Sequence, residues 1–204
     1  PNCQLLQQAQ SRSRPHFNQL FAIQNPTEDL GWADIVTEAV TKAVTGVFPQ
    51  ANNLPNNILK KQDATLKTFC SQNLQFIDNL FFFCHANFNP TSPLDSGLKL
   101  ADGVLTLENI IANLNLSHCS LVTLSACETG QVAVDRTDEY ISLSSGFILA
   151  GSPSVLVSLW SVNQVSTALL LIRTYELLQQ QPGQLALSLQ AAQKWLRETT
   201  VSGF

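Results

Sequence analysis

The sequence predicts an α/β fold whose mostly parallel sheet carries helices on both faces. Two observations support this prediction. Short apolar runs such as Leu80–Cys84 and Leu121–Leu124 end abruptly in small or polar residues, which is typical of buried parallel strands. Stretches with apolar residues at helical spacing lie between or after these runs, and strands that alternate with helices favour a parallel sheet covered on both sides.

The first half of the chain alternates strand and helix. Asn25-Pro26 stops the first strand, and Thr27 with two acidic residues precedes the first amphipathic helix, as is usual at a helix start. The predicted order is a polar, partly helical lead (1–15), a strand (17–23), a helix (36–43), a short edge strand among loops (48–59), a weak helix (64–76) and a strand (80–84).

The second half starts with a stretch rich in Pro, Asn and Ser, which favours a functional loop without regular structure. Gly103 marks the turn of a hairpin, and Pro182-Gly183 separates the last two helices. The predicted order is a loop (86–97), a hairpin (98–106), a helix (107–114), a central strand (121–124), a loop (132–145), a short helix (146–150), a core strand (154–159) and two helices (168–178 and 185–196).

Composition restricts the class of protein. Charged residues make up 13% of the 204 residues, against roughly 25% in an average globular protein, and the net charge is −4. This acidic balance argues against nucleic acid as a partner. No apolar run approaches the roughly 18 residues that span a bilayer, and the N-terminus lacks an apolar signal region. We therefore expect one soluble, cytoplasmic domain without a membrane partner. The odd number of cysteines, 5, favours free thiols over a disulfide framework.

A cysteine and a histidine follow two of the predicted strands. Cys127 comes just after the strand Leu121–Leu124, and His85 comes at the end of Leu80–Cys84. Ligands of open α/β sheets bind beyond the carboxyl ends of the strands, so two parallel strands would bring these side chains together. A cysteine nucleophile with a histidine is the pair that thiol hydrolases use. From the pattern alone, a buried structural cysteine with an unrelated histidine explains these residues equally well.

Two further Cys/His neighbours, Cys84-His85 and His118-Cys119, raise the possibility of zinc. Adjacent residues of a strand point to opposite faces, so neither pair readily gives both ligands to one tetrahedral metal. We expect no metal and no cofactor, and we interpret Cys84 and Cys119 as small buried apolar residues.

Longer motifs resemble a known family. The stretches FFFCHANFNPTSPLDSGLKLADG, LVTLSACETG and DEYISLSSGFILAGSPSVLVSLWSVN are similar to those of the CHAT family, caspase-like and separase-like domains found with tetratricopeptide repeats in bacteria. The resemblance implies a caspase-like three-layer sandwich and a cysteine endopeptidase whose dyad is His85 and Cys127. It also implies that residues 1–204 are a single domain, the C-terminal catalytic part of a larger protein, which cleaves a protein or peptide partner under control of its tetratricopeptide repeats.

The residue after the histidine departs from the family pattern. The resemblance implies that the backbone N–H groups of Ala86 and Cys127 bind the oxyanion, but the family usually has Gly where this chain has Ala86. A Cβ at a position that needs a positive φ would cost roughly 1 kcal/mol or tilt the donor. Ala86→Gly would then raise turnover up to about fivefold. The same departure motivates an alternative, a catalytically silent interaction or scaffold domain.

Loops around the expected site supply candidate substrate contacts. The candidates for the substrate groove are Asp102, Asp138, Glu139 and Trp160. An acidic residue there would select a basic substrate side chain, although a solvated loop explains each acid equally well, and core packing explains Trp160 equally well. A thiol esterase or transferase remains a further alternative, because it would use the same nucleophile, acid and oxyanion hole.

Overall fold

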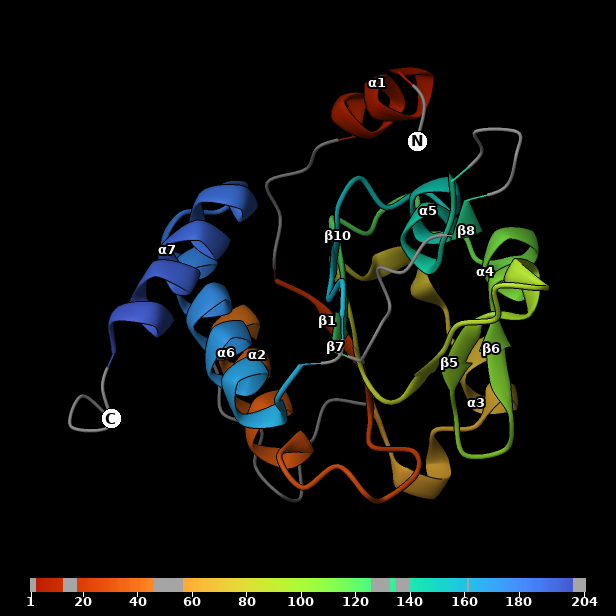
Figure 1. The fold of residues 1–204 in the computed structure, drawn as a ribbon, viewed down its shortest axis with the longest axis horizontal. Helices are drawn as coiled ribbons and strands as arrows, with labels where there is room; N and C mark the ends of the chain where they lie inside the picture. Colours follow the sequence, from red (N-terminus) through yellow and green to blue (C-terminus); the bar gives the residue numbers. More distant parts are fainter. Residues whose placement is uncertain are drawn as a thin grey trace.

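Five parallel strands form the central sheet in the computed structural model of the protein. Figure 1 shows the whole fold, with this sheet seen along its edge. The structure describes residues 3–12, 18–45, 57–125, 133–134, 140–160 and 162–199. Their α-helices and strands are α1 (Cys3–Ser11), β1 (Leu20–Gln24), α2 (Ala33–Thr45), β2 (Ile58–Lys60), α3 (Leu66–Cys70), β3 (Asn79–Phe83), β4 (Ala86–Asn87), β5 (Gly97–Lys99), β6 (Val104–Thr106), α4 (Leu107–Asn113), β7 (Leu121–Ser125), β8 (Ala133–Val134), β9 (Tyr140–Ile141), α5 (Leu143–Leu149), β10 (Val155–Val157), α6 (Gln164–Gln180) and α7 (Leu185–Glu198).

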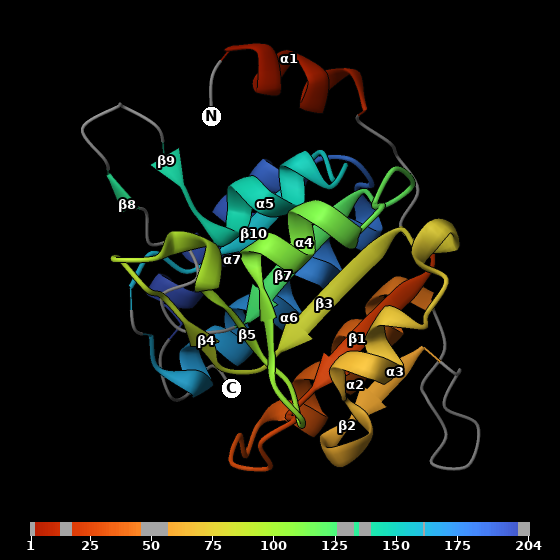
Figure 2. The ribbon, with the colours of Figure 1, turned by 90° about the vertical axis from the view of Figure 1, so that its right-hand side faces the viewer.

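The strand order of the sheet is β10-β7-β3-β1-β2. Figure 2 shows β1 and β3 side by side and pointing the same way. In the last rung, Phe83 of β3 pairs with Gln24 of β1 on one side and with Ser125 of β7 on the other. The carboxyl ends of these three strands therefore lie level at one edge of the sheet, which is where ligands of such sheets bind.

The phenylalanines of β3 pack into two hydrophobic cores, one on each face of the sheet. Successive strand residues face opposite sides of a sheet, and every residue of β3 is buried. Phe82 packs between Phe69 of α3 and Phe147 of α5, while Phe81 packs against Tyr175 of α6. The first core also includes α4, and the second includes α2. The predicted α/β sandwich with helices on both faces of a parallel sheet is confirmed.

The two long C-terminal helices are those that the sequence predicts. Asn163 caps α6, because its side chain accepts hydrogen bonds from the N–H groups of Val165 and Ser166. Gly183 then takes a φ of +84°, a conformation that glycine adopts cheaply, between α6 and α7. No helix in the described ranges has both the length and the apolar character needed to cross a membrane.

Two stretches predicted as loops contain regular structure. The prolines after His85 follow β4 rather than interrupt it, so Ala86 and Asn87 pair with β5. Helix α5 begins at residue 143, inside the predicted loop 132–145, because the hydroxyls of Ser142 and Ser145 cap each other's backbone N–H groups. The predicted absence of regular structure was wrong at both places. Local capping and long-range strand pairing are the reasons.

The predicted core strand 154–159 is an edge strand. It corresponds to β10, which pairs only with β7 among the described strands, and its three residues are half-buried. The predicted edge strand in 48–59 is β2, at the other end of the sheet. An apolar run alone does not tell a central strand from an edge strand, since both bury at least one face.

Candidate active site

His85 lies two residues beyond the last paired residue of β3. Its carbonyl oxygen accepts a hydrogen bond from the Lys99 N–H of β5 at 2.8 Å, which fixes the backbone at the end of the strand. Its side chain is 42% exposed, so a substrate can reach the ring. Cys127 stands at the equivalent place in the chain, two residues beyond Ser125, which pairs with Phe83. Cys127 itself lies outside the described residues.

An acidic residue holds the His85 ring. The Nε2 atom of His85 lies 3.0 Å from each of the two carboxylate oxygens of Asp29. The Thr27 hydroxyl donates a hydrogen bond to the same carboxylate, and this bond, followed by the contact with His85, lowers the pKa of Asp29. A lowered pKa keeps the carboxylate charged at neutral pH, so the contact is lost only when the pH falls through that lowered value.

Sequence reasoning missed Asp29 as a site residue. It treated the acid only as part of a helix start, although Asp29 also follows the strand β1 that ends level with β3. Acidic residues are common at helix starts, where the backbone N–H groups favour negative charge. The available signal was therefore weak: an acid after a strand, with no indication that this strand neighbours the one that carries His85.

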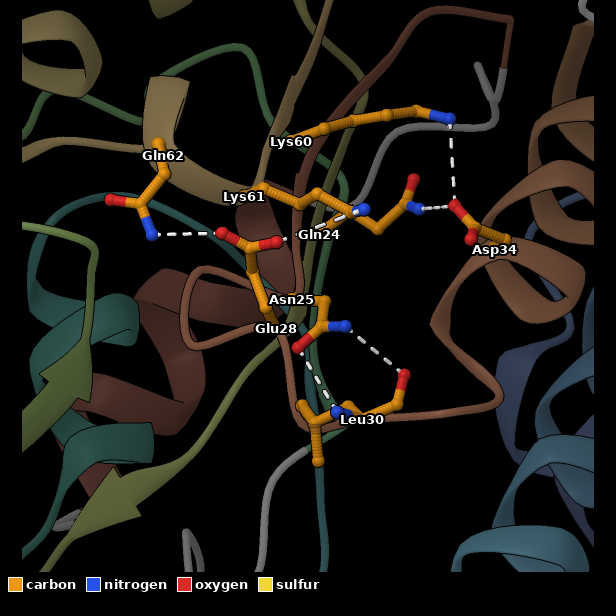
Figure 3. Close-up of polar contacts among 8 residues, drawn as sticks. All are labelled: Gln24, Asn25, Glu28, Leu30, Asp34, Lys60, Lys61 and Gln62. Atoms are coloured by element: carbon orange, nitrogen blue, oxygen red, sulfur yellow. Dashed lines mark hydrogen bonds and ion pairs between the residues drawn. The ribbon is translucent and has the colours of Figure 1, made fainter.

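The loop that presents Asp29 is built by an asparagine. Asn25 has a φ of +47°, and its amide side chain both accepts from the Leu30 N–H at 3.1 Å and donates to the Leu30 carbonyl at 3.2 Å (Figure 3). The Asn25 N–H also donates to the Phe83 carbonyl at 2.8 Å, which ties the loop to the end of β3. A backbone hydrogen bond thus joins the loop that carries Asp29 to the strand end that carries His85.

Further polar contacts hold Glu28 of this loop and the neighbouring start of α2 in place. Glu28, with a φ of +63°, lies 3.8 Å from the Lys61 ammonium and accepts from the Gln62 amide at 2.9 Å, and Asp34 contacts Lys60 and Gln24 (Figure 3). Asn25, Glu28 and Lys61 are the non-glycine residues with positive φ in the part of the chain that the structure describes. Such backbone conformations concentrate at functional sites, where surrounding contacts hold them.

Ala86 is free of the strain expected from its Cβ. Ala86 lies in β4, and its φ is not positive. The expected need for glycine at this position was therefore wrong. Because Lys99 donates to the carbonyl of His85, Ala86 and Leu98 form a non-hydrogen-bonded pair of the antiparallel ladder. The Ala86 N–H therefore points away from β5, toward the side of β4 on which the described residues place no further strand of the small sheet formed by β4, β5 and β6.

The absence of strain changes what Ala86→Gly should do. We expect kcat/KM for a cleavable peptide to change by less than about twofold, because no backbone strain is relieved. The free energy of unfolding should fall by roughly 0.5–1 kcal/mol, since glycine loses more conformational freedom in a strand. Peptide hydrolysis and thermal unfolding of the two proteins would check both values. A severalfold gain in rate would show that the Cβ does obstruct the site.

Other predicted site residues have different surroundings. The Asp102 carboxylate accepts from the Leu66 N–H at 2.6 Å, so it holds the start of α3. The Trp160 side chain follows β10 and is 66% exposed, which excludes the core packing considered for it and leaves a groove role as a prediction. Asp138 and Glu139 lie outside the described residues.

The buried cysteines are held neutral. Burial raises the pKa of Cys84 to about 12 and that of Cys119 to about 11, so both thiols remain protonated at neutral pH. Cys70 is exposed. Within the described ranges no three His, Cys, Asp or Glu side chains lie close enough together to hold a metal ion.

The comparisons with known proteins point to one family. The family model described as CHAT domain matches residues 1–202, which is nearly the whole chain. The comparison with curated proteins gave no significant match.

Proposed function

The chain belongs to the CHAT domain family, and from this premise we propose that it is a cysteine endopeptidase that uses Cys127 and His85 to cleave a protein or peptide partner. The observation that carries the proposal is the level pairing of Phe83 with Ser125, since each dyad residue stands two positions beyond one of these strand ends. Control by tetratricopeptide repeats of the full-length protein and action in the cytoplasm, without a cofactor, are parts of the same proposal.

The contact with Asp29 supports separate roles for the two ring nitrogens of His85 in this proposal. A neutral imidazole carries one proton, and Nε2 faces both oxygens of a charged carboxylate, so the proton belongs on Nε2. The Nδ1 atom is then the basic nitrogen. In the proposed reaction Nδ1 takes the proton of the Cys127 thiol, and the charge of Asp29 stabilises the imidazolium that forms.

The remaining steps follow from this proton transfer. The Cys127 thiolate attacks the peptide carbonyl, and the Ala86 and Cys127 N–H groups stabilise the tetrahedral oxyanion. The C–N bond then breaks, the leaving amine takes the proton from Nδ1, and water hydrolyses the acyl-enzyme. The outward N–H of Ala86 supports its part in this scheme. The alternative of a silent domain loses its main motivation, because Ala86 introduces no backbone strain.

A thiol-directed peptide probe tests the proposal. A peptidyl acyloxymethyl ketone should label the full chain once, at neutral pH, and mass spectrometry should locate the label on Cys127. Cys84 and Cys119 should stay unlabelled, because their raised pKa values leave almost no thiolate.

Matched variants separate this result from general thiol reactivity. Labelling should persist in Cys70→Ser, which removes an exposed thiol, and should disappear in Cys127→Ala. An unlabelled Cys127 in a chain with a normal cooperative unfolding transition would reject the enzyme and favour the interaction domain.

A further inference from the structure

A pocket opens beside His85 on the side of the sheet that α6 covers. Its described lining comes from three places: Leu30 in the loop after β1, the ends of β3 and β7 with His85 and Ser125, and the start of α6 with Gln164 and Thr167, next to Val162. Its empty space is about 400 Å³, including the part open to solvent. Part of this space is open to solvent, so a side chain of a bound peptide can enter it from outside.

The place of the pocket identifies what enters it, if the proposed function holds. His85 would transfer the proton in the reaction, and Ser125 stands two residues before the nucleophile. The scissile carbonyl must lie between the two strand ends, and its own residue's side chain branches one bond away from that carbonyl. A pocket that contacts both strand ends is therefore within reach of this side chain.

The described lining of the pocket is mostly apolar. Apart from His85, no described lining residue carries a charge. The adjacent acid, Asp29, turns both carboxylate oxygens toward the ring of His85 and is not one of the described lining residues. A charged side chain that lost its water against the apolar side chains of Leu30, Phe83 and Val162 would find no opposite charge on them, and such an unpaired burial is costly. The geometry thus points to a specificity pocket for an uncharged, aliphatic or thioether side chain, such as leucine or methionine, immediately before the scissile bond.

A second cavity adjoins the pocket. It lies between β7, β10, α6 and α7, has about 460 Å³ of empty space with its solvent-open part included, and shares Ser125 and Thr167 with the first. Residues that line both cavities form the wall between them. The hydroxyl of Thr167 donates to the Asn163 carbonyl at 2.9 Å, which holds this wall at the start of α6. Thr167 is therefore the position at which a change of charge should alter the selectivity most directly.

Peptide substrates that differ only in the residue before the scissile bond test the inference. With the unmodified chain, kcat/KM should be at least about tenfold higher for leucine or methionine than for lysine, arginine, aspartate or glutamate. Thr167→Asp should raise the ratio of lysine to leucine cleavage at least about tenfold, and a carboxylate in the first turns of a helix is compatible with folding. Thr167→Asn, which has the same size without the charge, should leave this ratio unchanged.

An exposed position provides a second variant. Gln164→Glu changes the charge of the pocket rim with almost no change of shape and should raise the same ratio by a smaller factor. Two results would overturn the pocket assignment alone. One is a preference of the unmodified chain for a charged residue before the scissile bond. The other is an equal lysine-to-leucine ratio in Thr167→Asp and Thr167→Asn when both variants cleave peptides. Failure to cleave any peptide, together with an unlabelled Cys127, would overturn the proposed function and this inference with it.

Discussion

Replacing His85 with alanine should lower kcat/KM for peptide cleavage by roughly 10²–10⁴-fold, the usual contribution of a positioned acid–base group. The loss should appear mainly in kcat, because the ring acts on protons that move in the transition state. The His85 side chain is 42% exposed, so thermal unfolding should change little. Hydrolysis of the preferred leucine or methionine peptide provides the measurement.

His118→Ala is the matched control for this variant. His118 is exposed and lies just before β7, at the opposite edge of the sheet from His85, so its loss should leave kcat/KM within about twofold of the original value. Equal activities of His85→Ala and His118→Ala, in a chain that labels at Cys127, would remove His85 from the mechanism.

Asp29→Asn should lower kcat by roughly ten- to a hundredfold and leave KM nearly unchanged. An amide in this place still contacts Nε2 but carries no charge to stabilise an imidazolium, and its NH₂ group can favour the wrong tautomer. In a buried triad the same change costs about 10⁴-fold. Asp29 is 59% exposed, so solvent should screen its charge and reduce the effect. Initial rates at neutral pH, where the carboxylate is charged, provide the measurement.

Glu28→Gln is the control for Asp29→Asn because it removes the same charge from the neighbouring residue. Glu28 contacts Lys61 and Gln62 instead of His85, so this variant should retain most of the activity. Asp29→Glu should recover part of the lost rate by returning a carboxylate. If Glu28→Gln lowers kcat as much as Asp29→Asn does, the role of the loop is to support the fold, and Asp29 has no particular role toward His85.

The sequence by itself determined the fold class. The β3 residues Leu80–Phe83 are apolar and buried at every position, and buried parallel strands show this continuous apolar pattern before any tertiary contact is known. The sequence also identified His85 as a residue just beyond a strand end. Helices α6 and α7 were predicted from their spacing and from the Pro182-Gly183 break, which are signals that lie within a few residues of each other.

Only the tertiary structure decided which strands are neighbours, and with that the partners of His85. Asp29 lies 56 residues before His85, and its role depends on β1 pairing with β3, a long-range contact that no local pattern specifies. The same reason applies to Ala86. The extended conformation of Ala86 follows from the antiparallel pairing of β4 with β5. The comparison of this single residue with the family pattern could not include that pairing, and it therefore suggested backbone strain that the structure does not show. The pocket beside His85 likewise brings together three segments far apart in the chain, because strand ends and a helix start meet only when the sheet has formed.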